Sequence, residues 1–123
     1  MCGLAGFLSR EGCGAAQACT LLTAMAAPLT HRGPDSGGQW SDPAAGVGLA
    51  HRRLAILDLS PAGAQPMACA SGRLVLVFNG EIYNHLALRQ ELQQGGQAPA
   101  WHGHSDTETL LAAIAAWGLE ETL

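Results

Sequence analysis

Lysine is absent from this sequence, and charged residues make up only 13% of its 123 positions. All 6 basic residues are arginines, they are dispersed along the chain, and the formal net charge is −4. A nucleic-acid-binding surface needs clustered positive charge. The composition therefore predicts no nucleic-acid partner.

Long apolar runs are also missing, since none approaches the roughly 18–20 residues that a membrane span needs. The N-terminus lacks the basic start and apolar stretch of a secretory signal. We therefore expect a soluble, cytoplasmic protein without a membrane partner. The 48% hydrophobic content can supply the core of one small domain.

The cysteines also lack the spacing that is typical of metal ligands. The 4 cysteines are Cys2, Cys13, Cys19 and Cys69. Because nothing indicates secretion, we expect no disulfides and interpret the last three as ordinary thiols. His102 and His104 stand close together, but no third ligand is nearby, so we expect no metal site.

Cys2 is the clearest candidate for a reactive residue. Removal of Met1 would expose a thiol and a free α-amino group on one residue, and aminopeptidases generally accept a small residue at position 2. The thiolate is the attacking form of cysteine, and an α-amino group titrates at roughly 7.7–8.0, close enough to neutral pH to accept the thiol proton. The dipeptide alone is compatible with chance as well as with a catalytic nucleophile.

The first third of the chain favours a strand followed by a helix. A short apolar run predicts a buried strand over 4–8, which would place Cys2 at a strand end. The Ala, Leu and Met pattern predicts a helix over 15–27 that ends at Pro28.

The middle of the chain favours strands and a loop. Residues 39–41 and 47–50 are predicted to form a hairpin. The proline- and alanine-rich segment 60–71 is expected to be an exposed loop. The run 73–78 is the clearest strand in the sequence and is expected to be buried on both faces.

The last third favours helices. One is predicted to be capped by Asn84 and ended by Gly95, and a short strand is expected around 98–102. A second helix is predicted over 105–117, because its first serine and Glu108 have the capping-box spacing. Strands and helices together indicate the α+β class.

Five segments carry a family resemblance when they are taken in chain order. They are Cys2–Gly6, His31–Asp35, His51–Asp58, Phe78–Asn84 and Ser105–Glu108. Any one of them would be a weak match, but together they resemble the glutaminase domain of glutamine-hydrolysing asparagine synthases, which are class II, N-terminal-Cys amidotransferases. The Phe before Asn-Gly favours this branch over the sugar-phosphate and phosphoribosyl amidotransferases.

The resemblance implies the four-layer αββα sandwich of the N-terminal-nucleophile hydrolases. Residues 1–123 would be the N-terminal part of a glutamine amidotransferase type-2 domain, without the ATP-dependent synthetase domain. No cofactor is expected in this chain, since ATP and Mg would belong to the synthetase domain. We expect such a piece to expose sheet edges and apolar surface and to be less stable than the full domain.

The resemblance also implies catalytic roles. Cys2 would be the nucleophile with its own amine as base, and Asn79 and Gly80 would donate to the oxyanion. Without the resemblance, Asn-Gly after a strand would equally be a hairpin turn.

Substrate-binding roles follow in the same way. Arg53 would clamp the α-carboxylate of glutamine, because its guanidinium forms a bidentate fork. Asp106, with Glu81, would receive the α-ammonium, although a carboxylate there also suits a helix start. Leu54 and Ile56 would contribute backbone contacts and pocket wall.

Three further residues, His31, Arg32 and Asp35, are expected to order a loop over the site, while Arg52 is expected to be structural. The predicted reaction converts L-glutamine to glutamate and ammonia for an asparagine-synthase-type amidation. The expected partners are glutamine and a synthetase domain, and a homodimer is left open. The alternative is a truncated, non-catalytic glutamine-binding or assembly module.

Overall fold

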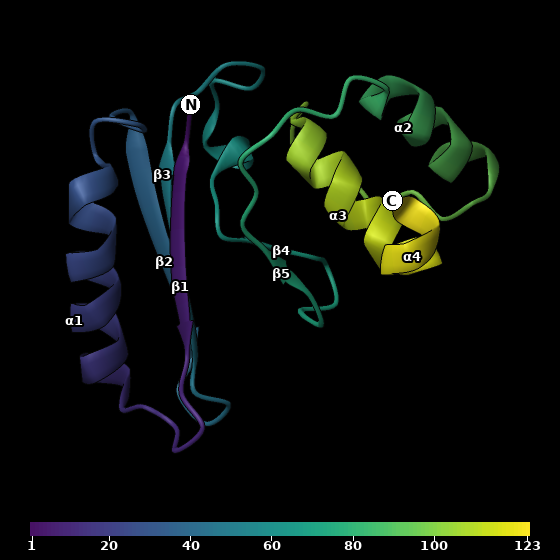
Figure 1. The fold of residues 1–123 in the computed structure, drawn as a ribbon. Coiled ribbons are helices and arrows are strands. Elements are labelled where there is room, and N and C mark those ends of the chain that lie inside the picture. The colour runs from purple at the N-terminus through teal and green to yellow at the C-terminus, as the bar shows by residue number, and fades with distance from the viewer. The chain divides into compact units, whose positions relative to one another are not determined.

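A computed structural model describes all 123 residues as a mixture of α-helices and small antiparallel sheets (Figure 1). The chain divides into two compact units. The sheet unit comprises 1–55, 64–66 and 77–79, and the helical unit comprises 56–63, 67–76 and 80–123. None of the helices is long and apolar enough to cross a membrane.

The sheet unit is built on three antiparallel strands, β1 (Gly3–Leu8), β2 (Ser36–Asp42) and β3 (Val47–Arg53). Their order is β1-β3-β2, so β3 is paired on both sides. The strand predicted over 4–8 is present, but it is not buried as expected, since Leu4 is 45% and Leu8 is 76% exposed. The predicted hairpin is confirmed, and its strands are longer than the sequence pattern suggested.

One face of this sheet is covered by α1 (Ala15–Ala26), which lies alongside the strands (Figure 1). Its buried residues, Ala18 and Leu22, form the core of the unit with Ala50 of β3. The helix gives way to a 3₁₀ turn, η1 (Ala27–Leu29), at the predicted proline. The predicted helix is therefore confirmed, and its two buried residues, which are four apart, lie on one face.

The opposite face of the sheet keeps large apolar side chains exposed. Leu4, Leu8 and Trp40 share this face, because residues alternate along each strand and paired residues point to the same side. The expected exposed apolar surface is thus present on this sheet.

The helical unit contains six elements. They are η2 (Pro61–Gly63), β4 (Met67–Ala68), β5 (Val75–Leu76), α2 (His85–Gln94), α3 (Asp106–Trp117) and α4 (Leu119–Thr122). Leu92 of α2 packs with Ala112 and Ala113 of α3, and Trp101 covers this cluster. Both long helices had been predicted from the sequence.

The prediction of a strand over 73–78 that is buried on both faces is wrong. Only Val75 and Leu76 form a strand, and the apolar residues of the run are half-buried. Its β-branched residues satisfy strand propensity, but a strand also needs a partner. Here the partner is the two-residue β4, which limits the ladder to two pairs.

The strand expected around 98–102 is also absent. The N–H groups of Gln97 and Ala98 donate to Leu92 O at the end of α2, and His102 N donates to Glu108 Oε1. Ala98 and His102 therefore bond to a helix end and to a side chain rather than to a neighbouring strand. The loop 60–71 is less exposed than expected, since Gly63 and Gln65 within it are buried.

Helix capping follows the predictions only in part. The Ser105 hydroxyl accepts a hydrogen bond from Glu108 N at 3.1 Å, as an N-cap should. The Glu108 carboxylate does not return to Ser105 and instead binds the preceding loop. Asn84 stands at the N-cap of α2 without a side-chain cap bond, and α2 ends at Gly95 as predicted.

Candidate active site

Cys2 immediately precedes β1, at the end of the strand where the sequence had placed it. The register pairs Gly3 with Arg52, so Cys2 lies beside the residues that follow Arg52 on β3. Leu54 N donates to the Cys2 Sγ at 3.3 Å, and Sγ lies 3.6 Å from Leu54 O. The sheet register therefore fixes the thiol against the backbone of a predicted pocket residue.

The loop before β2 is bonded to the same strand end. Arg32 Nε donates to Cys2 O at 3.3 Å, and Ala55 N donates to the Asp35 carboxylate at 2.9 Å. Arg52 Nε donates to Gly33 O at 3.0 Å, and a side chain at Gly33 would collide with the backbone of Arg52. These contacts order the loop next to Cys2, as expected of Arg32 and Asp35.

His31 contributes differently. Its Nδ1 lies 2.8 Å from Pro28 O, so it contacts the turn that ends α1 rather than Cys2. Arg52 has the structural role that the sequence indicated, because its guanidinium contacts the loop backbone.

Phe78 and Asn79 lie at the end of an apolar segment, and residues 77–79 of it belong to the sheet unit. Phe78 N donates to Gln65 Oε1 at 2.6 Å, and His51 Nε2 donates to Phe78 O at 3.2 Å. His51 is only 1% exposed and Gln65 is also buried, whereas Asn79 is exposed. The predicted oxyanion residue thus follows a peptide that two buried side chains hold.

Sequence reasoning assigned no role to His51 or Gln65. Burial lowers the pKa of His51 below its ordinary value of 6.5, the positive charge of Arg53 lowers it further, and the Phe78 carbonyl opposes the shift. The ring is therefore neutral near pH 7, and its Nδ1 is buried without a hydrogen-bond partner. The available signals were that His51 directly follows the predicted strand 47–50 and opens the resembling segment His51–Asp58.

The helical unit carries Asp106 at the first position of α3. One carboxylate oxygen accepts from Ile82 N and the other from Thr107 N, both at 2.8 Å, and the residue is 6% exposed. The first bond holds Asp106 beside the residue that follows Glu81. Asp106 therefore acts at the start of α3, as one of its two expected roles.

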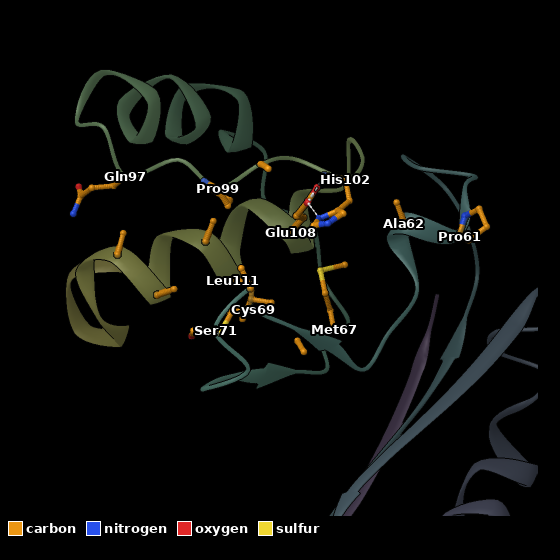
Figure 2. A pocket seen from close by; sticks show the side chains of 16 residues that line it. Pro61, Ala62, Met67, Cys69, Ser71, Gln97, Pro99, His102, Glu108 and Leu111 are labelled. Atoms are coloured by element: carbon orange, nitrogen blue, oxygen red, sulfur yellow. Dashed lines mark hydrogen bonds and ion pairs between the residues drawn. The ribbon is translucent and has the colours of Figure 1, made fainter.

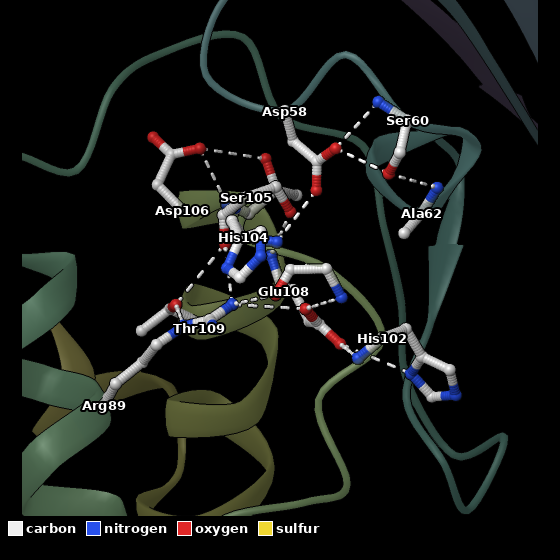
Figure 3. Close-up of polar contacts among 12 residues, drawn as sticks. Asp58, Ser60, Ala62, Arg89, His102, His104, Ser105, Asp106, Glu108 and Thr109 are labelled. Atoms are coloured by element: carbon white, nitrogen blue, oxygen red, sulfur yellow. Dashed lines mark hydrogen bonds and ion pairs between the residues drawn. The ribbon is translucent and has the colours of Figure 1, made fainter.

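The loop before α3 is held by a polar network around Glu108 (Figure 3). The Glu108 carboxylate accepts from Arg89 Nη2 at 3.2 Å, from His102 N at 2.8 Å and from Gly103 N at 3.1 Å. Asp58 accepts from His104 N at 2.8 Å. The segment that leads into Asp106 is thus fixed by buried carboxylates.

Arg89 of α2 completes this network and was not predicted. It also donates to Thr109 Oγ1 at 2.8 Å and to Gly103 O at 3.0 Å. Its guanidinium lies 4.1 Å above the Trp101 ring. No single-sequence pattern marks an arginine that joins two helices and a loop.

A cavity of about 880 Å³ lies within the helical unit (Figure 2). Its wall is mainly small and apolar, from β4, α3 and the loop between α2 and α3, with Glu108 and His102 at one side. The eight predicted site residues do not line it. The cavity is therefore separate from the predicted glutaminase residues.

Cys69 lines this cavity and differs from the ordinary thiol that we expected. The Ser71 hydroxyl lies 3.3 Å from its Sγ, and Leu74 N donates to the sulfur at 3.3 Å. The Ser71 hydrogen bond is the main reason why the pKa of Cys69 is lowered, and backbone donors add to it. No three His, Cys, Asp or Glu side chains lie together so as to hold a metal ion.

The predicted residues are divided between the two units. The sheet unit holds Cys2, Arg53, Leu54 and Asn79, and the helical unit holds Ile56, Gly80, Glu81 and Asp106. Within the sheet unit, Cys2 and Leu54 are in direct contact. Ile56 is 69% exposed, and Gly80 and Glu81 are exposed as well.

Comparisons with known proteins identify the family of this chain. Residues 1–123 match the glutamine amidotransferase domain family, so the chain belongs to that family. It is of class II and is related to the glutamine-hydrolysing asparagine synthetases.

Three relatives illustrate the relationship. Glutamine-hydrolyzing asparagine synthetase 1 of Bacillus subtilis is 39% identical over 113 residues, which cover 91% of this chain and 17% of that protein. A putative asparagine synthetase of Mycobacterium tuberculosis is 39% identical over 135 residues, with 98% and 20% covered. Amidase chry2 of Gibberella zeae is 34% identical over 127 residues, with 97% and 18% covered. The chain thus spans about a fifth of the length of these relatives or less.

Proposed function

We propose that this chain hydrolyses the side-chain amide of glutamine, with Cys2 as the nucleophile after removal of Met1. One observation carries the proposal: in a member of the glutamine amidotransferase family, the thiol of residue 2 is held against Leu54 N at 3.3 Å. Met1 is 72% exposed and the strand pairing starts only at Gly3, so removal of Met1 would leave the sheet intact.

In the proposed reaction, the amine of Cys2 takes the thiol proton, and the sulfur attacks the amide carbon. The oxygen of the tetrahedral intermediate accepts hydrogen bonds from the Asn79 side chain and Gly80 N–H. The carbon–nitrogen bond then breaks, and the nitrogen leaves as ammonia with the transferred proton. Water cleaves the resulting thioester, which releases glutamate and restores the thiol.

The two ends of the substrate require opposite charges. Arg53 would bind the α-carboxylate, since a guanidinium pairs bidentately with a carboxylate. Asp106, whose oxygens each accept one backbone N–H, keeps lone pairs that could accept the α-ammonium, and Glu81 would add a second negative charge. Leu54 and Ile56 would complete the wall.

We extend the proposal to the fold and to the use of the ammonia. A sheet with α1 on one face and exposed Leu4, Leu8 and Trp40 on the other is what a four-layer αββα sandwich requires of one sheet. The ammonia would serve an asparagine-synthetase-type amidation, because several relatives carry that name.

Glutamate release from glutamine, measured together with intact mass, tests the proposal. The protein without Met1 should release glutamate, and Cys2→Ala should lose essentially all of this activity, since the proposed thioester forms on the Cys2 sulfur. Cys19→Ala is the matched control, because Cys19 is an exposed thiol on α1 of the same unit. Turnover that survives in Cys2→Ala would contradict the assignment of Cys2 as the nucleophile. A processed wild-type chain without turnover would favour the non-catalytic module.

A further inference from the structure

We propose that His51 is a positioning residue for Asn79, which the proposed function makes the side-chain donor of the oxyanion hole. The inference rests on that proposed function and deepens it. It arises from one contact within the sheet unit, the hydrogen bond from His51 Nε2 to Phe78 O at 3.2 Å.

The bond acts on Asn79 through a rigid group. The carbonyl of Phe78 and the N–H of Asn79 belong to one planar peptide unit. Holding the carbonyl oxygen therefore sets the direction in which the chain enters Asn79. Gln65 holds the other side of Phe78, because its Oε1 accepts the Phe78 N–H at 2.6 Å.

Support from the backbone matters for Asn79 because this residue is exposed. A donor to a developing oxyanion is effective only when it is oriented before the reaction. The two buried side chains bonded to the backbone of the preceding residue are His51 and Gln65, and we assign the orientation of Asn79 to them.

The position of His51 is itself fixed by strand pairing. It lies in β3, the central strand, where it is paired with Leu4 on one side and with Gly38 on the other. The same strand ends at Arg53, and the next residue, Leu54, holds the Cys2 sulfur. One strand thus supports both the nucleophile and the residue that precedes the oxyanion donor.

The second nitrogen of the ring strengthens the inference. Nε2 must carry the proton, because a carbonyl can only accept. Nδ1 is then a buried acceptor without a partner, which is a cost that an apolar side chain of similar size would avoid. The donor at Nε2 explains why a polar ring is kept at this position.

A pair of variants separates the hydrogen bond from packing. His51→Leu keeps much of the volume but cannot donate, whereas the side-chain amide of His51→Gln reaches about as far as Nε2 and can donate to Phe78 O. We expect His51→Leu to lower kcat for glutamate release by about 10- to 100-fold, since loss of an entire oxyanion donor costs about 10²–10³. KM should change less than about threefold, and His51→Gln should restore most of kcat.

A second measurement separates positioning from a purely structural role: the affinity for a ligand that forms a tetrahedral adduct. A purely structural role of His51 would leave this affinity unchanged. The analogue of glutamine with an aldehyde in place of the amide adds the Cys2 thiol: a carbon–sulfur bond forms, and the carbonyl oxygen receives the negative charge or a proton. Its Kd should rise in His51→Leu by about the same factor as kcat falls. All values are taken per folded molecule, with the folded fraction of each variant measured by circular dichroism, so that unfolded molecules are not counted.

The outcomes are distinct. His51→Leu with wild-type kcat and aldehyde affinity, or a His51→Gln variant as impaired as His51→Leu, overturns the inference alone. Wild-type protein that releases no glutamate overturns the proposed function and this inference with it. If His51→Leu does not fold, ¹⁵N spectra of the wild-type ring decide: a protonated Nε2 and a bare Nδ1 support the assignment, and the reverse tautomer overturns it.

Discussion

The sheet unit and the helical unit hold their candidate residues by different means. In the sheet unit, backbone pairing positions Cys2, and its sulfur is bonded to the N–H of Leu54. In the helical unit, the loop before Asp106 is held by side chains, chiefly Glu108 and Arg89. Backbone ladders survive most side-chain substitutions, whereas a buried polar network fails when one member is removed.

The largest expected effect is therefore in the helical unit. Glu108→Ala leaves the charge of Arg89, whose side chain is 13% exposed, without its carboxylate, and it leaves the N–H groups of His102 and Gly103 without their acceptor. Breaking a buried ion pair in this way costs about 3–5 kcal/mol. Urea unfolding at neutral pH should show a loss of this size.

Residue-resolved hydrogen exchange tests whether the loss of stability is confined to the helical unit. Amides of α2 and α3 should lose protection in Glu108→Ala, while amides of β1 and β3 should keep theirs. Glu91→Ala is the control, because Glu91 is an exposed carboxylate on α2, and its loss should cost less than about 0.5 kcal/mol. Equal losses of protection in both units would contradict the contrast drawn here.

The sheet unit should instead respond to acid through one side chain. The pKa of His51 in the folded chain lies below 6.5 because the ring is buried. As the pH falls below about 6.5, His51 of the unfolded chain takes up a proton before His51 of the folded chain does. The stability that the neutral, buried ring contributes is therefore complete above that pH and is lost as the pH falls through the pKa of the folded chain. Thermal midpoints measured from pH 7.5 to 5 should fall more steeply for wild type than for His51→Gln. Parallel curves would contradict the assignment.

Local signals in the sequence were sufficient for much of the fold. The apolar run after Cys2 predicted β1, and the alanine-rich segment before Pro28 predicted α1. Ser105 marked the start of α3, because an N-cap bond forms between residues three apart. Each of these features depends on near neighbours in the chain.

The remaining features depend on residues distant in sequence. The run 73–78 has strand propensity throughout, but its pairing was limited by the length of β4. Glu108 had capping-box spacing, yet its carboxylate binds the loop and Arg89. His51 acquired its contact with Phe78 only through folding. Of the candidate site, the sequence and its resemblance supplied the residue types, whereas the residues that support them required the structure.

The smallest expected effect concerns Cys69, which contrasts with Cys2. The Cys2 sulfur accepts from a backbone N–H, so no side-chain substitution removes its donor. The Cys69 sulfur lies 3.3 Å from the Ser71 hydroxyl, and this hydrogen bond lowers the pKa of the Cys69 thiol. Ser71→Ala should raise that pKa and leave the fold intact.

Because the thiolate is the reactive form, Ser71→Ala should slow alkylation of Cys69 by iodoacetamide at pH 7 a few-fold and move the midpoint of its pH–rate curve upward. Mass spectrometry of the Cys69 peptide measures this rate, with exposed Cys19 of α1 as the internal control. The N–H of Leu74 still donates to the Cys69 sulfur in the variant, which is why the change should be modest. An unchanged Cys69 rate would mean that backbone donors stabilise this thiolate as well, and the two units would then treat their cysteines alike.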